Sequence, residues 1–136
     1  MAAPLSADLL LATPLARQLY HEHAANLPIV DYHCHLDPAD LANDRRFDNL
    51  AQLWVAGDPY KHRAMRLAGV PERLITGDAS DREKFEAWAA TVPLTLGNPL
   101  HLWTALELQR YLGIEEALDA GSSDRIWRTA QVRLAE

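Results

Sequence analysis

Two histidines separated by one residue are the strongest chemical signal in the sequence, in the run Asp31-Tyr32-His33-Cys34-His35. Because alternate side chains of a strand share a face, His33 and His35 are expected to point the same way, with Cβ atoms about 6–7 Å apart. Imidazole nitrogens bind a divalent ion at about 2.0–2.1 Å, so one ion fits between the two rings. A catalytic metal needs further protein ligands. The pair is therefore a candidate half of a metal site; the alternative is two surface histidines at a strand end.

A second run of the same form, His21-Glu22-His23, lies in a helical pattern. Residues two apart on a helix diverge by about 200°, so these rings do not share a ligand, and we expect them on the helix surface or in packing contacts. Cys34 should face away from the strand histidines, which argues against a nucleophilic role. As the only cysteine, it excludes an intrachain disulfide.

Basic and aromatic side chains gather at one expected helix start, where Tyr60, Lys61, Arg63 and Arg66 follow Asp58-Pro59. A helix N-terminus favours anions, and the cations add to that preference. The carboxylate and hydroxyls of a sugar acid would suit such a patch, with Tyr60 as proton donor or acceptor or as a hydrogen-bond partner of a substrate oxygen. The alternative is a solvated basic face with Tyr60 packed at its edge.

The elements that position these groups are mostly helical. Thr13, Asp58 and Asn98 each precede a proline, as N-caps do, and Ser80 to Glu83 form a capping box. Helices are predicted over 14–25, 49–56, 59–68, 81–92, 99–112 and from 124 onward, with shorter turns near 38–43, 71–76 and 115–119. Gly57, Gly69 and Gly113 are predicted to follow helix ends.

The expected core follows from helical periodicity. Phe85, Trp88, Ala89 and Val92 repeat at i, i+3, i+4 and i+7 and so form one buried face. The four tryptophans, Trp54, Trp88, Trp103 and Trp127, all fall at helical positions and are predicted to lie in the core.

Only one strand is predicted, over residues 28–33, where β-branched Ile29 and Val30 follow Pro28. A lone buried strand leaves its backbone groups unpaired, and the last helix runs to Glu136 without a stop signal. We therefore expect residues 1–136 to be a single incomplete domain of the α/β class, truncated at the C-terminus. Alone, this chain should fold poorly and be inactive. The alternative is a complete helical domain.

Composition excludes several functions. The formal net charge is −6, and the cations form no long run, so nucleic acid is not an expected partner. No stretch approaches about 18 apolar residues, which argues against a membrane span. The N-terminus lacks a signal-peptide pattern, so a cytoplasmic location is the default.

Collinear blocks along the chain resemble the N-terminal segment of the uronate (glucuronate) isomerase family, which belongs to the amidohydrolase superfamily. The resemblance covers residues 8–115. Its blocks are Leu19-Tyr20-His21, Pro28-Ile29-Val30-Asp31-Tyr32-His33-Cys34-His35-Leu36, Phe47-Asp48-Asn49-Leu50, Arg63-Ala64-Met65-Arg66, Ile75-Thr76-Gly77-Asp78-Ala79-Ser80, Lys84-Phe85-Glu86-Ala87-Trp88-Ala89, Thr91-Val92-Pro93, Gly97-Asn98-Pro99-Leu100 and Leu106-Glu107-Leu108.

This resemblance implies a distorted (β/α)8 barrel whose first strand is near 29–33, with His33 and His35 at its C-terminal end, followed by a helical elaboration. It implies isomerisation of D-glucuronate to D-fructuronate and of D-galacturonate to D-tagaturonate. It also implies a divalent metal, with zinc the expected ion, held by His33 and His35. Tyr60 matches a family tyrosine near the substrate, and Tyr60 and Arg63 are the expected substrate-binding residues. A homo-oligomer of the full-length protein fits the same resemblance.

The chain departs from the family pattern at a few positions. Pro59 stands where the family has a histidine before the tyrosine, and on a helix His62 points elsewhere. Two functional alternatives remain: a metal-dependent hydrolase of the same superfamily, with metal-bound water as nucleophile, and a non-enzymatic helical module.

Overall fold

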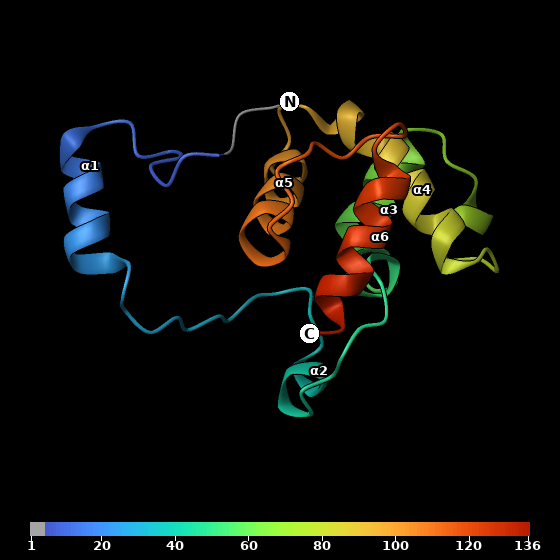
Figure 1. Ribbon diagram of the computed structural model, residues 1–136, viewed down its shortest axis with the longest axis horizontal. Helices are drawn as coiled ribbons and strands as arrows, with labels where there is room; N and C mark the ends of the chain where they lie inside the picture. Colours follow the sequence, from blue (N-terminus) through green and yellow to red (C-terminus); the bar gives the residue numbers. More distant parts are fainter. Residues whose placement is uncertain (1–4) are drawn as a thin grey trace.

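The structure, a computed structural model, describes residues 5–136, and its regular elements in that range are all helical (Figure 1). In chain order they are α1 (Pro14–Gln18), π-helical η1 (Leu19–Ala24), α2 (Pro38–Ala42), π-helical η2 (Ala51–Val55), α3 (Pro59–Leu67), η3 (Glu72–Leu74), α4 (Asp81–Thr91), η4 (Val92–Thr95), α5 (Pro99–Leu112) and α6 (Ser123–Leu134). These bounds confirm the predicted helices to within a few residues. The expected turn near 115–119 contains bends but no helix.

Local capping chemistry sets the helix starts as predicted. The side chains of Thr13, Asp58 and Asn98 each accept a backbone N–H of the helix that follows. Ser80 and Glu83 form both halves of the capping box that starts α4. Gly113 ends α5 with a left-handed φ of 65°, a conformation that costs glycine little. Gly57 does not adopt such a φ.

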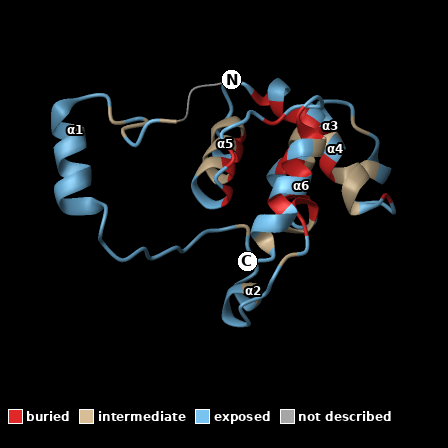
Figure 2. Cartoon of the chain, viewed as in Figure 1, coloured by how far each residue is buried: buried red, intermediate tan, exposed pale blue. Residues whose placement is uncertain are grey.

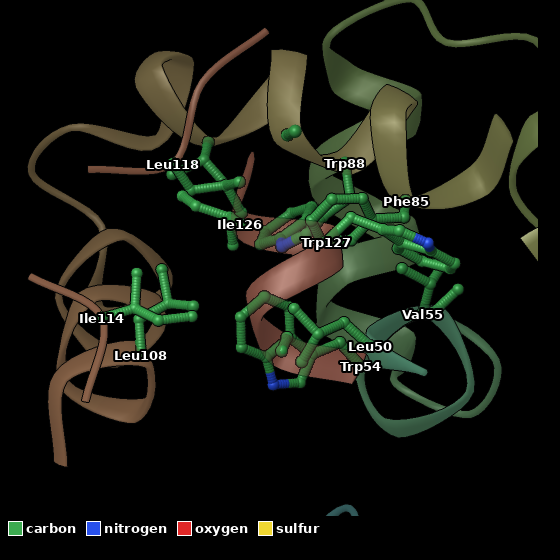
Figure 3. Packing of buried hydrophobic residues seen from close by; sticks show 14 of the residues in the cluster. Leu50, Trp54, Val55, Phe85, Trp88, Leu108, Ile114, Leu118, Ile126 and Trp127 are labelled. Atoms are coloured by element: carbon green, nitrogen blue, oxygen red, sulfur yellow. The ribbon is translucent and has the colours of Figure 1, made fainter. Parts of the chain in front are cut away.

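Helix α4 is the centre of a helical body that we define as residues 49–134. It packs against η2, α3 and α6, and its Phe85 and Trp88 are fully buried (Figure 3). The Phe85 ring neighbours those of Trp54 and Trp127, with centroid separations of 6.5 and 5.0 Å. Burial of these large apolar surfaces is the main stabilising term of the body. The predicted face of Phe85, Trp88, Ala89 and Val92 is confirmed.

Trp103 contradicts the prediction that all four tryptophans lie in the core, since it is 47% exposed. The buried stripe of α5 is formed by Leu100, Thr104, Leu108 and Leu112. Trp103 lies about 120° around the helix from the middle of that stripe, so its ring faces outward.

The predicted strand over 28–33 is not formed within residues 5–136. Its residues have no regular structure, and Ile29 and Val30 are 90% and 85% exposed. The physical reason is that the described chain offers no second strand to pair with this backbone. The observed fold is therefore mostly helical, and the strand prediction is wrong for this structure.

Residues 5–37, which we call the N-terminal arm, loop away from the helical body (Figure 1). None of them is buried (Figure 2), and α1 continues without a break into η1 as one helical segment. The arm is tied at one end by reciprocal hydrogen bonds between Leu5 and Gln109, at 2.7 and 3.2 Å. The helical body has a buried core of its own, so the expectation that the isolated chain folds poorly applies to this arm. That expectation stays a prediction.

None of the helices in the described range combines the length and apolar character of a membrane crossing.

Candidate functional site

His33, His35 and Tyr60 come together where the arm meets the start of α3. The ring centroids of His33 and His35 lie 5.7 Å apart, with planes inclined at 60°. The rings of His35 and Tyr60 are in edge-to-face contact, with their centroids 4.2 Å apart. Three of the four predicted site residues thus form one cluster, although 25 positions separate His35 from Tyr60 in the sequence.

The separation of the two imidazoles matches the spacing that a shared divalent ion requires. Two rings bound to one tetrahedral ion at about 2.0–2.1 Å would have centroids roughly 5 Å apart, close to the observed separation. Within residues 5–136, no three histidine, cysteine, aspartate or glutamate side chains are arranged so that they could hold a metal ion together. A metal site built on His33 and His35 would therefore need further ligands from outside this cluster.

Asp58 is the member of the cluster that the sequence analysis missed, because it was interpreted only as an N-cap. Its Oδ1 accepts the Tyr60 N–H at 2.8 Å and lies 3.0 Å from His35 Nδ1. Its Oδ2 accepts the Lys61 ammonium at 2.7 Å. A carboxylate accepts at both oxygens, so one side chain serves the helix start, the histidine and the lysine. No sequence signal pairs positions 35 and 58.

Lys61 lies inside the molecule and not on the predicted basic face. Its side chain is 10% exposed, and its ammonium lies 5.9 Å from the centre of the Trp88 ring. Burial raises the pKa of Asp58, but the hydrogen bond and charge of Lys61, together with hydrogen bonds from Tyr60 and His35, outweigh it, so the pKa is lowered overall. Burial also raises the pKa of Glu107, and the Lys61 charge opposes that rise.

The other two basic residues separate from Lys61. Arg66 pairs with Glu72 on the surface, with one nitrogen–oxygen separation of 2.8 Å. Arg63 and Tyr60 line a groove of about 640 Å³ between α3, η4 and α5, whose other walls include Leu94, Leu96 and Trp103. The predicted patch is thus divided, and Arg63 is the cation that shares a surface with Tyr60.

The remaining histidines are engaged elsewhere. The His62 ring hydrogen-bonds the Val55 carbonyl, so it does not take the place of the family histidine at Pro59. His101 bonds the Val92 carbonyl at 3.1 Å. His21 contacts Asp8 at 2.7 Å, and His21 and His23 are exposed on η1, as predicted for helix-surface residues. Cys34 is exposed, with its Sγ 3.3 Å from the Leu36 carbonyl oxygen.

Comparison with known proteins gives one consistent relationship. A family model described as glucuronate isomerase matches residues 1–136. The chain is 58% identical over 132 residues to a uronate isomerase of Vibrio vulnificus (strain YJ016), covering 96% of this chain and 28% of the relative. It is 50% identical over 129 residues to a uronate isomerase of Lachnospira eligens, covering 95% of this chain and 28% of that protein.

Solved structures agree with these relatives. The crystal structure of uronate isomerase from Thermotoga maritima superimposes with a TM-score of 0.89 at 34% identity, covering 98% of this chain and 30% of that one. Glucuronate isomerase from Caulobacter crescentus gives a TM-score of 0.72 at 26% identity, covering 82% of this chain and 25% of that one. The chain thus spans between 25% and 30% of the length of these proteins.

Proposed function

Because the chain belongs to the glucuronate isomerase family, we propose that it forms part of an aldose–ketose isomerase of hexuronates. The proposed reactions interconvert D-glucuronate with D-fructuronate and D-galacturonate with D-tagaturonate. The observation that carries the proposal is the cluster of His33, His35 and Tyr60, which joins two metal-binding side chains to a phenol in a chain similar to uronate isomerases over nearly its whole length.

The same proposal includes the architecture of the complete enzyme. The exposed segment 29–33 would become the first strand of a distorted (β/α)8 barrel once a neighbouring strand accepts its backbone hydrogen bonds. The exposed side chains of Ile29 and Val30 support this role, because residues 5–136 leave their apolar surface uncovered. Barrels of this class carry their sites at the C-terminal ends of strands, where His33 and His35 would lie. A cytoplasmic location and a homo-oligomer of the longer protein complete the proposal.

Each side chain has a role that its position supports. His33 and His35 would hold a divalent metal, with zinc the expected ion, and the metal when bound would polarise substrate oxygens. Tyr60, about half exposed beside His35, would move a proton at, or hydrogen-bond to, the oxygens of C1 and C2 as hydrogen passes between those carbons. Arg63, on the same groove, would bind the substrate carboxylate.

The proposal is tested by asparagine substitution of each strand histidine, with metal content measured by elemental analysis. His33→Asn and His35→Asn should each lower the metal bound per protein at least about tenfold, since each removes a ligand. The chain offers matched controls in its second His-x-His run: His21→Asn and His23→Asn should leave metal content unchanged. Unchanged metal content in the first pair would contradict the assignment.

The Tyr60→Phe variant tests the role of the Tyr60 hydroxyl independently of metal binding. The variant keeps the ring against His35 but loses the hydroxyl, so metal content should persist while uronate isomerisation falls about 10²–10⁴-fold. Isomerisation of both uronates is compared with hydrolysis of amides and esters. An enzyme that hydrolyses esters and leaves uronates unchanged would refute the proposed function.

A further inference from the structure

Asp58 connects the histidine segment to the helical body. Among the hydrogen bonds of residues 27–36, the contact of His35 Nδ1 with Asp58 Oδ1 at 3.0 Å is the one that reaches that body. The others, such as the Asp31 oxygen with the His33 N–H, are local to the segment. The orientation of the His35 ring therefore depends on Asp58 and on the Tyr60 ring beside it.

The Asp58 side chain is itself held on two sides. Its Oδ1 caps α3 through the Tyr60 N–H, and its Oδ2 contacts the Lys61 ammonium, with Asp58 and Lys61 side chains only 12% and 10% exposed. Lys61 in turn lies against Trp88, which is fully buried in the core. The carboxylate thus belongs to a series of contacts that runs from the core to His35.

We propose that Asp58 is a positioning residue that sets the His35 tautomer, with Lys61 holding its carboxylate in place. A carboxylate only accepts hydrogen bonds, so His35 must carry its hydrogen on Nδ1, which leaves the lone pair of Nε2 free. A ligating histidine that donates its other N–H to a carboxylate is fixed in orientation and made more basic. This inference rests on the proposed function where it concerns the metal, and on the His35–Asp58 contact alone where it concerns the tautomer.

The test compares Asp58→Ser and Asp58→Asn in the full protein. Serine and asparagine both cap helices, and Asn98 already caps α5 ahead of a proline in this chain. Serine is too short to reach both His35 and Lys61. Asparagine has one acceptor oxygen, so it must either present its amide group to Lys61 or turn that group toward His35. The matched control is Asp124→Asn on α6, which removes a carboxylate paired with Arg82 and Arg128.

Two readouts distinguish positioning from simple structural support. In metal-free protein at alkaline pH, ¹⁵N shifts of the His35 ring should report the Nδ1–H form in the parent and in Asp124→Asn, and a loss of that form in Asp58→Ser. Zinc affinity, measured by chelator competition, should fall about 10–100-fold in Asp58→Ser. Circular dichroism of each variant checks that its helices are retained.

The outcomes separate the inference from the proposed function. If the Nδ1–H form of His35 persists in Asp58→Ser as in the parent, the inference is overturned, whatever the metal content. Zinc affinity unchanged in Asp58→Ser, with a parent that binds zinc, overturns its metal part and leaves the proposed function standing. A parent that binds no divalent metal contradicts the metal site under the proposed function, while the ¹⁵N readout still decides the role of Asp58.

Discussion

Replacement of Lys61 by methionine tests whether the buried ion pair at the start of α3 stabilises the helical body. Methionine keeps the apolar contact with Trp88 but leaves the Asp58 carboxylate, 12% exposed, without its cation. Breaking a buried pair from one side costs about 3–5 kcal/mol, because a charge is left uncompensated. We expect about 3 kcal/mol, near the lower limit, because Asp58 retains the Tyr60 N–H and His35.

The control lies on the same helix. Arg66 pairs with Glu72, but both side chains are about half exposed, so Arg66→Met should cost less than about 1 kcal/mol. The double variant Lys61→Met/Asp58→Asn removes both charges and should recover at least about 1 kcal/mol relative to Lys61→Met.

Urea unfolding of the chain, followed by circular dichroism, measures these differences, and a constant slope would show that the unfolding reaction is the same in each variant. If Lys61→Met is no more destabilising than Arg66→Met, burial does not decide the strength of this ion pair and the reasoning is refuted.

Two further predictions concern the capping box and the arm. The Arg73 guanidinium, with the Ser80 N–H and hydroxyl, lowers the pKa of Glu83 to about 2 from its ordinary 4.5. Its stabilisation should therefore be complete above about pH 4.5 and lost as pH falls toward 2. Thermal melts at several pH values should show a weaker dependence in Glu83→Gln than in the parent, with the remaining dependence coming from other carboxylates such as Glu72, whose pKa is also lowered to about 2. Because no residue of the arm is buried, trypsin should cleave after Arg17 before it cleaves after Arg82, and mass spectrometry that found the reverse order would show that the arm is protected.

Local chemistry made the helices predictable. A cap is formed by groups two or three residues apart, so Asn98, Ser80 and Glu83 could be recognised without knowledge of the fold. The buried face of α4 follows from periodicity for the same reason. The His33 and His35 pair was found from spacing, and their adjacency in space agrees with it even though the expected strand is absent.

Long-range contacts decided the rest. Whether a helix residue faces inward depends on where its neighbours pack, so Lys61 lies inside and Trp103 outside, against the expectation from composition and helical position. A strand exists only when a second strand supplies its hydrogen-bond partners, and the described residues contain none for segment 29–33. The contact of His35 with Asp58 spans 23 positions, a separation that no local pattern encodes. The sequence by itself therefore determined the helix boundaries and the candidate donors, while the tertiary structure decided which carboxylate orients one of them.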